Sequence, residues 1–382
     1  MEKIERSMVE KRLFDKMKNI PFIKPSVPPI DEYFNEISDI WHTTMFTNIH
    51  SKHEKLEDAL KKHLAVNNVS LFVNGHMALE AALSYFQLKG EVITSPFTFS
   101  STCLAIMRNG LTPVFCDINE KNYTVNVDSL ERLINEKTCA VLPVHIYGNV
   151  CDVYAIEKIS EKYEVPVIYD AAHAFGVKVN ERGIGSFGNI SMFSFHSTKV
   201  FNTVEGGALT YADDKMYEHF AHFRNFGQKN RETVIVGANM KMSELHAAMG
   251  LCNLRHINSC IEKRKNCVNR YNERLIDIKG LHLNQPQNGV VSNYTHYPIR
   301  INEKEFGETR DSVFERLSRH DITTQKYYYP LVSNMAIFDK NPSNYDTPVA
   351  DEIAKQILVL PLYSELTIED VDYVCKIILE HQ

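Results

Sequence analysis

The sequence predicts an α/β fold, a mostly parallel sheet with helices on both faces, followed by a smaller C-terminal α+β unit. Three observations support this prediction. Short apolar runs alternate with helical segments between residues 69 and 211. Beyond about residue 213 the strand signal fades into a long helical stretch. The first 50 residues hold four prolines, Pro21, Pro25, Pro28 and Pro29, in an irregular segment that we expect to wrap over the body.

Each expected strand is a short run rich in Val, Ile and Phe, which is typical of a buried strand. The runs are Val69 to Val73, Glu91 to Thr94, Thr112 to Asp117, Ala140 to Tyr147, Val165 to Asp170, Ile190 to Phe195 and Gly207 to Tyr211. Helices are expected between them, at His76 to Leu88, Asp128 to Asn135 and Val153 to Tyr163. This repeated strand, helix, strand order predicts one mostly parallel seven-stranded sheet.

The predicted organisation has three parts. Residues 1–50 form an irregular or helical segment that packs on the body, residues 51–250 the large α/β domain, and residues 251–382 a small α+β domain. Apolar positions at helical spacing predict a helix from Met242 to Ile276. In the small domain we expect strands at Thr295 to Ile301 and around Thr323 to Tyr329, and a last helix at Thr367 to Leu379.

Charge and composition exclude several classes of function. The net charge of the 382 residues is -6 and no basic run follows the pattern of a nucleic-acid or membrane-surface site, so we expect neither partner. Met1 to Met17 is dense in charge and lacks the apolar core of a signal peptide, which predicts a cytoplasmic protein. The eight cysteines form no Cys-x-x-Cys pair or Cys/His cluster, so we expect free thiols and no metal site.

The most informative segment is Ser-Phe-His-Ser-Thr-Lys, from Ser194 to Lys199, which directly follows an expected strand. A lysine in this place lies where open α/β sheets bind ligands, although taken alone it could equally be a solvated surface charge.

A second segment, Val-Pro-Val-Ile-Tyr-Asp-Ala-Ala-His-Ala, ends its strand at Asp170. A carboxylate there could bind a metal, act as a base, pair with a cationic ring nitrogen or cap a helix. In a third segment, Phe-Val-Asn-Gly-His-Met-Ala-Leu, the chain turns at Gly75 into a helix whose free amide groups suit a phosphate.

In combination, these segments supply a lysine that can form an imine, a carboxylate for a pyridine nitrogen and a phosphate seat. Those are the protein groups that pyridoxal 5'-phosphate (PLP) chemistry requires. The Asp-Ala-Ala-His-Ala and Ser-Phe-His-x-x-Lys motifs, and the chain from about Thr47 to Leu360-Pro361-Leu362-Tyr363, resemble the DegT/DnrJ/EryC1/StrS family of nucleotide-sugar aminotransferases. The resemblance implies the type I PLP-dependent aminotransferase fold and PLP as cofactor.

The resemblance also implies roles for individual residues. Lys199 would carry the cofactor as a Schiff base and move the proton, and Asp170 would hold the pyridine nitrogen. His173 would lie near the phenolic oxygen and Phe99 would stack on the ring, with core packing as the alternative for both. The phosphate would be bound by Ser194, by the backbone of Gly75, His76 and Met77, and by Asn225 of a partner subunit; the substrate would be bound by Asn239 and Lys241.

The Asn225 assignment implies a homodimer with shared active sites. The chain departs from the family at Asn74-Gly75-His76, where many relatives have Ser-Gly-Thr, so an imidazole replaces a phosphate-binding hydroxyl. Relatives with histidine in place of the lysine perform dehydration, and Lys199 argues against that reaction.

The expected reactants are L-glutamate and a nucleotide-linked keto sugar. The similarity is greatest to members that aminate dTDP-4-keto-6-deoxyglucose at C4, giving dTDP-4-amino-4,6-dideoxyglucose for surface polysaccharide such as O-antigen. Alternatives are a C3 aminotransferase, an enzyme acting on a UDP or GDP sugar, and a regulator that binds PLP or a nucleotide sugar without turnover. A dinucleotide-binding oxidoreductase is disfavoured because no Gly-x-Gly-x-x-Gly follows the first strand.

Overall fold

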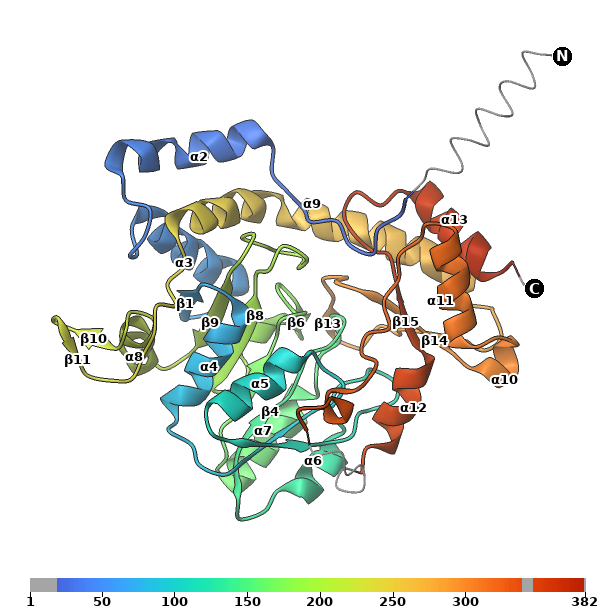
Figure 1. Ribbon diagram of the computed structural model, residues 1–382, viewed down its shortest axis with the longest axis horizontal. Helices are drawn as coiled ribbons and strands as arrows, with labels where there is room; N and C mark the ends of the chain where they lie inside the picture. Colours follow the sequence, from blue (N-terminus) through green and yellow to red (C-terminus); the bar gives the residue numbers. More distant parts are fainter. Residues whose placement is uncertain (1–18, 339–345, 381–382) are drawn as a thin grey trace.

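The centre of the molecule is a pair of β-sheets that lie edge to edge between layers of helices (Figure 1). The computed structural model describes residues 19–338 and 346–380. One sheet has the order β1-β9-β8-β5 and the other β3-β2-β4. Their strands are β1 (Asn68–Phe72), β2 (Glu91–Thr94), β3 (Thr112–Phe115), β4 (Thr138–Leu142), β5 (Ile168–Asp170), β8 (Ile190–Ser194) and β9 (Gly207–Tyr211).

Each of the seven expected runs therefore contains a strand, but the strands form a four-stranded and a three-stranded sheet and not one continuous seven-stranded sheet. Strands β4 and β5 are joined only by the isolated bridges Val141 to Val167 and Val144 to Asp170. Pairing is parallel between β2 and β3, β2 and β4, and β5 and β8. Strand β9 runs antiparallel to both of its neighbours, β1 and β8. The carboxyl ends of β1, β2, β4, β5 and β8 consequently lie at the same edge.

Helices cover both faces of these sheets, as the alternation of side chains along each strand requires. In the described part of the chain the helices are α2 (Ile30–Thr43), α3 (Ser51–Leu64), α4 (Gly75–Tyr85), α5 (Ser100–Arg108), α6 (Val127–Leu133), α7 (Val153–Tyr163), α8 (Lys215–Phe223), α9 (Glu244–Leu275), α10 (Glu303–Phe306), α11 (Arg310–Arg319), α12 (Pro348–Gln356) and α13 (Ile368–Ile378), with short 3-10 turns at Ile184–Ser186 and Val332–Asn334. Met192 of β8 packs in a core with α4, α5 and α8, whereas its neighbour Phe193 packs in a core with α3, α7 and α9.

The long helix α9 links the two ends of the molecule (Figure 1). Ala247 and Ile257 near its start belong to the core of the large unit, and Tyr271 and Leu275 near its end belong to the core of the C-terminal unit. The predicted boundary at residue 250 thus falls inside a helix. The Glu244 carboxylate accepts backbone hydrogen bonds from His50, Lys52 and His53, which fastens the start of α3 to the start of α9.

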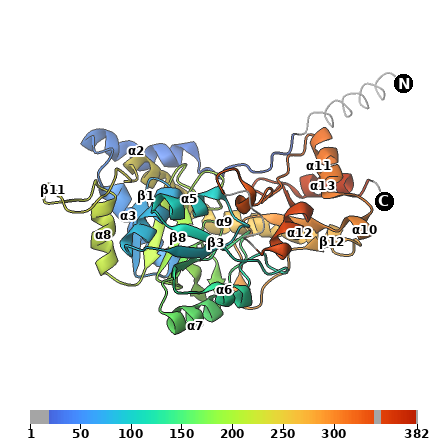
Figure 2. The ribbon, with the colours of Figure 1, turned by 60° about the horizontal axis from the view of Figure 1, so that its bottom comes forward.

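The C-terminal unit, at the right of Figures 1 and 2, packs α11 and α13 against a small antiparallel sheet. The sheet has the order β12-β14-β15, with β12 (Leu281–Leu283), β14 (Tyr297–Ile301) and β15 (Ile357–Leu360). The strand predicted around Thr323 to Tyr329 is wrong: that segment makes a single isolated bridge, from Gln325 to Val359, and Pro330 behind it has no amide hydrogen to extend a ladder. The helix predicted at Thr367 to Leu379 is confirmed as α13.

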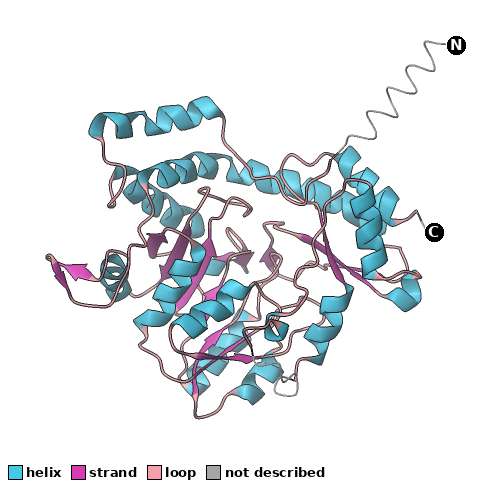
Figure 3. Cartoon of the chain, in the orientation of Figure 1, coloured by secondary structure: helices cyan, strands magenta, loops and turns pink. Residues whose placement is uncertain are grey.

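The remaining strands of the described residues are short and pair in two small sheets. Strand β6 (Lys178–Val179) pairs with β7 (Arg182–Gly183) and β13 (Val290–Val291), and β10 (Gln228–Lys229) pairs with β11 (Glu232–Thr233). The β10-β11 hairpin projects from the body beside α8 (Figure 3). The first 18 residues of the predicted N-terminal segment lie outside the described part; its next residues run from the C-terminal unit to α2, which packs on α9 through Ile37 and Ile40.

Two findings bear on classes of site. No helix within residues 19–338 and 346–380 combines the length and the apolar character needed to cross a lipid bilayer. All eight cysteines are free thiols, as expected.

Candidate active site

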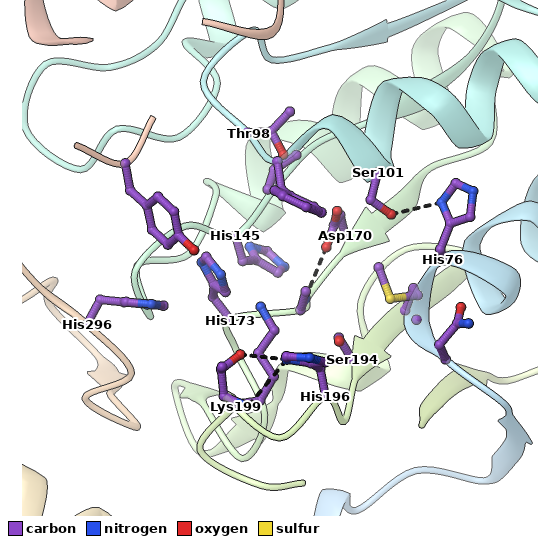
Figure 4. Close-up of a pocket in the computed structure, with 18 of the residues that line it drawn as sticks. His76, Thr98, Ser101, His145, Asp170, His173, Ser194, His196, Lys199 and His296 are labelled. Carbon is purple, nitrogen blue, oxygen red and sulfur yellow. Dashed lines mark hydrogen bonds between the residues drawn. The ribbon is translucent and has the colours of Figure 1, made fainter. Parts of the chain in front are cut away.

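A pocket of about 410 Å³ opens where the carboxyl ends of the parallel strands meet (Figure 4). Ligands of open α/β sheets bind at this edge. The large unit supplies most of the lining, and the loop before β14, the segment after α11 and Ile23 of the N-terminal segment close the other side. The polar residues that line it are Asn74, His76, Thr98, Ser101, His145, Asp170, His173, Ser194, His196, Thr198, Lys199, Glu205, His296, Tyr327 and Tyr328.

Lys199 reaches this pocket from the turn that follows β8 (Figure 4). The turn is closed by a 2.9 Å hydrogen bond from the Lys199 amide to the His196 carbonyl, so the side chain is turned back toward the sheet edge. Burial disfavours the ammonium form and lowers the pKa of Lys199 to about 8, although the nearby charge of Asp170 opposes this shift. The amine is therefore more readily available as a nucleophile than that of a solvated lysine.

Asp170 ends β5 at the floor of the pocket and is only 5% exposed. Its Oδ2 accepts a 2.8 Å hydrogen bond from the Thr102 hydroxyl, and its Oδ1 accepts one of 3.0 Å from the Ala172 amide. Burial raises the pKa of Asp170, while these hydrogen bonds and Lys199 oppose the rise. A cation placed against this carboxylate would stabilise its charged form.

Three buried imidazoles, His145, His173 and His296, surround this floor (Figure 4). Burial keeps all three neutral: it lowers the pKa of His145 to about 3 and those of His173 and His296 well below the ordinary value. The Nδ1 atom of His173 accepts a hydrogen bond from the Tyr147 amide at 3.3 Å. Its single ring proton therefore lies on Nε2, which makes His173 a hydrogen-bond donor there.

The predicted phosphate seat lies at the start of α4. A Cβ atom on Gly75 would come within 2.9 Å of the Ser194 Cβ, so only glycine lets the two segments approach this closely. Gly75, His76 and Ser194 all line the pocket. Met77 does not: its amide donates a 2.9 Å hydrogen bond to the Asn74 side chain, which caps the helix. The predicted set of phosphate-binding amides is therefore reduced to Gly75 and His76.

Phe99 lines the pocket from the residue before α5 and is 60% exposed. A phenyl ring this open is not part of the core, which removes the packing alternative and leaves its face available to a flat ligand. His173 is only 6% exposed. It lines the pocket and also packs at a tilt against His296, with ring centroids 4.6 Å apart, so its position agrees with both alternatives, a site residue and core packing.

Asn225, Asn239 and Lys241 form a separate cluster that is not part of the lining of this pocket. Asn225 and Asn239 pair as an isolated antiparallel bridge, and Lys241 donates a 2.6 Å hydrogen bond to the Asn225 side chain. The Lys241 ammonium also lies 5.2 Å from the centre of the Phe226 ring. The structure thus brings the three predicted ligands together, but outside the lining of this pocket.

Comparison with known proteins identifies the family of this chain. Residues 30–379 match the DegT/DnrJ/EryC1/StrS aminotransferase family. The chain belongs to this family. It is accordingly a PLP-dependent aminotransferase, and the lysine and aspartate of its pocket stand in the two motifs on which the resemblance rests.

Individual relatives cover nearly the whole aminotransferase. A dTDP-4-amino-4,6-dideoxy-D-glucose transaminase of Shigella dysenteriae is 38% identical over 364 residues, which span 95% of this chain and 99% of the relative. A GDP-perosamine synthase of Escherichia coli O157:H7 is 28% identical over 370 residues, spanning 95% and 99% of the two chains. The crystal structure of DesI in the presence of its TDP-sugar product superposes with a TM-score of 0.90 at 26% identity, covering 94% of this chain and 92% of DesI.

The pocket of this aminotransferase fits PLP on its own chemistry. It offers an amine of lowered pKa in Lys199, a buried carboxylate in Asp170 that a ring cation would stabilise, and a glycine-lined helix start for the phosphate. Its volume is within the usual range of cofactor pockets.

Several lining residues were not predicted from the sequence: His145, His296, Tyr327, Tyr328, Ser101 and Ile23. Thr102, which holds Asp170 from behind the lining, was not predicted either. His145 lies three residues beyond β4, so the rule that sites follow parallel strands could have found it. His296, Tyr327 and Tyr328 come from the C-terminal unit, and no local pattern indicated that they reach the large unit.

Proposed function

We propose that this aminotransferase moves the amino group of L-glutamate to a nucleotide-linked keto-6-deoxysugar, dTDP-4-keto-6-deoxyglucose, giving dTDP-4-amino-4,6-dideoxyglucose. The observation that carries the proposal is the 38% identity, over nearly the whole of both chains, to the dTDP-4-amino-4,6-dideoxy-D-glucose transaminase, against 28% to the GDP-perosamine synthase. We further propose that the product is used for surface polysaccharide, such as O-antigen, and that the reaction takes place in the cytoplasm.

In this proposal Lys199 has two tasks. Its amine would hold the cofactor covalently and, once released, would carry the proton between the reacting carbon of the amino donor or the sugar and the reactive carbon of the cofactor. Bound PLP supplies an electron sink that stabilises the charge formed when that proton leaves. The lowered pKa of Lys199 places its neutral form within reach near neutral pH, as a proton-transfer group requires.

Asp170 keeps the ring nitrogen protonated in this proposal, and the hydrogen bonds from Thr102 and Ala172 fix the orientation of the carboxylate. His173 donates from Nε2 toward the phenolic oxygen, since its Nδ1 atom is occupied by the Tyr147 amide. Phe99 covers one face of the ring. Ser194 and the amides of Gly75 and His76 bind the phosphate.

We propose a homodimer with shared active sites. Its support is the position of Asn225, Asn239 and Lys241, which lie together outside the pocket of their own chain. The adjoining surface is apolar: Phe226 is 49% exposed and Val236 is 93% exposed. A partner subunit that covers this surface would bring Asn225 to its phosphate and Asn239 and Lys241 to its substrate.

Subunit mixing tests this arrangement. We expect Lys199→Ala and Asn225→Ala homodimers each to lose activity, and a mixture refolded or co-expressed together to regain it. In a mixed dimer one site combines Lys199 of the Asn225→Ala subunit with Asn225 of the Lys199→Ala subunit. The other site has neither residue. Mixing Lys199→Ala with a Lys178→Ala variant, altered on exposed β6, is the control for subunit exchange. Sites that lie within one chain would show no recovery in the first mixture, because neither subunit would then hold a complete set.

The substrate proposal is tested by turnover with defined keto sugars. With L-glutamate as donor, we expect kcat/KM for dTDP-4-keto-6-deoxyglucose to exceed that for the GDP-linked 4-keto sugar and for a UDP-linked 3-keto sugar by about tenfold or more, the effect of about 1.4 kcal/mol of transition-state binding. Formation of 2-oxoglutarate and NMR of the amino sugar identify the product and the carbon that is aminated. A preference for either alternative sugar would overturn the assignment while leaving the aminotransferase chemistry intact.

A further inference from the structure

Beside the phosphate seat, a chain of polar contacts joins α4 to α5 (Figure 4). The Nε2 atom of His76 lies 2.9 Å from Oε1 of Glu80, one turn further along α4, and that carboxylate also binds Arg108 at the end of α5. On the other side of the ring, Nδ1 of His76 lies 2.9 Å from the hydroxyl of Ser101, in the first turn of α5. Glu80 is only 8% exposed, so its contacts are held in place by packing.

The two ring nitrogens have different partners, and this fixes where the protons are. A carboxylate only accepts, so Nε2 of His76 carries a proton and donates it to Glu80. When the ring is neutral, Nδ1 has no proton and accepts the hydroxyl hydrogen of Ser101. When the ring is protonated, Nδ1 donates to the Ser101 oxygen instead, and the hydroxyl hydrogen of Ser101 is free to point elsewhere.

Both residues line the pocket together with Gly75 and Ser194. The charged group that contacts the ring is Glu80, and Arg108 contacts that carboxylate in turn. Of the strands packed on α4, β1, β8 and β9 carry no charged residue and β5 carries Asp170 at its end, and α8 meets α4 near Tyr85 at its far end. The other charged groups of the pocket are Asp170, Lys199, His196 and Glu205, and the last two lie 3.6 Å apart as a pair of their own.

We propose that Ser101 is a further ligand of the cofactor phosphate and that protonation of His76 switches it on. Binding of the phosphate draws a proton onto His76, the ring then donates to the Ser101 oxygen, and the released hydroxyl hydrogen bonds a phosphate oxygen. Glu80, held by Arg108, balances the imidazolium charge. The inference rests on PLP being the cofactor. It also explains how the Asn-Gly-His turn can serve a phosphate without the hydroxyl that many relatives have there, because Ser101 of α5 supplies a hydroxyl instead.

The proposal is tested by the affinity of the full-length protein, freed of cofactor, for pyridoxamine phosphate between pH 5.5 and 9. This probe carries the phosphate but forms no imine with Lys199, so the titration of that lysine as a nucleophile does not enter. The variants are Ser101→Ala and His76→Gln. Glutamine can keep one hydrogen bond on each side but cannot take a proton. The matched control is Ser100→Ala, one residue earlier in the same turn and outside the lining of the pocket.

At pH 6 we expect Ser101→Ala and His76→Gln each to bind pyridoxamine phosphate about tenfold more weakly than the wild type, the effect of one hydrogen bond to a charged group. The difference between His76→Gln and the wild type should decrease toward the alkaline end of the range, because taking up a proton becomes less favourable there and glutamine takes up none at any pH. The phosphate of the probe titrates equally in all variants, so only the differences are read. Ser100→Ala should follow the wild type throughout.

Pyridoxamine, which lacks the phosphate, locates the effect. We expect the two variants and the wild type to bind it equally. Variants with wild-type affinity for pyridoxamine phosphate, or with equal losses for both probes, would overturn the inference, because in either case the relay would not act on the phosphate. Failure of the wild type to bind pyridoxamine phosphate at all would instead contradict the cofactor assignment itself.

Discussion

Lys199→Ala is expected to lower kcat for transamination by about 10⁴-fold, the upper end of the effect of losing a positioned acid-base group. The variant loses both the covalent attachment of the cofactor and the only pocket amine among the described residues that can move the proton. Single-turnover measurement with glutamate, followed as formation of 2-oxoglutarate, gives the chemical step directly.

The control for Lys199→Ala is Lys178→Ala, which removes an exposed lysine on β6 and should leave the rate unchanged. The fold should survive in both variants, since within the described part of the chain the Lys199 side chain joins no two elements by a hydrogen bond or ion pair, and an unchanged melting temperature would show this. A Lys199→Ala protein that retained more than about a hundredth of the wild-type single-turnover rate would place the catalytic amine elsewhere.

Asp170→Asn is expected to give the second largest loss, about 10²- to 10³-fold in kcat. Removing one partner of a buried charge pair costs about 3–5 kcal/mol, and here the pair would be the carboxylate and the protonated ring nitrogen. The amide is close in size and its single oxygen can accept from Thr102 or from the Ala172 amide, so the pocket should keep its shape. Steady-state kinetics with saturating cofactor separate the effect on kcat from weaker cofactor binding.

Two variants control for the Asp170 result. Asp152→Asn alters the exposed residue that caps α7, far from the pocket lining, and should leave kcat unchanged. Thr102→Val removes the hydrogen bond to Asp170 while keeping its charge, and should reduce kcat only a few-fold, as expected for one hydrogen bond to a buried carboxylate. A loss for Thr102→Val as large as that for Asp170→Asn would point to disturbed packing as the cause in both.

Sequence reasoning placed the residues whose position follows from the local chain. Asp170 ends a buried strand, and Gly75 and Lys199 lie in the turns that follow two others. Parallel strands carry their carboxyl ends to one edge, so the meeting of these residues could be foreseen. The helices α7, α9 and α13 were likewise visible in their apolar spacing.

What the sequence did not reveal depends on contacts between distant segments. His296 and Tyr327 reach the pocket only because the C-terminal unit folds back along α9. The Met77 amide donates to the Asn74 side chain and not toward the pocket, and this depends on the side-chain rotamer of Asn74. The Ser101 to His76 contact spans two helices, and neither residue has a distinctive neighbour in sequence.

The most direct test of the account is one absorption experiment on the purified protein with PLP, beside Lys199→Ala. The account predicts that the wild type shows the visible band of lysine-bound cofactor, that L-glutamate bleaches it, and that dTDP-4-keto-6-deoxyglucose then restores it as the sugar takes the amine. Lys199→Ala should show no lysine-bound band at any stage. A wild-type band that glutamate does not bleach, or that the keto sugar does not restore, would contradict the proposed reaction.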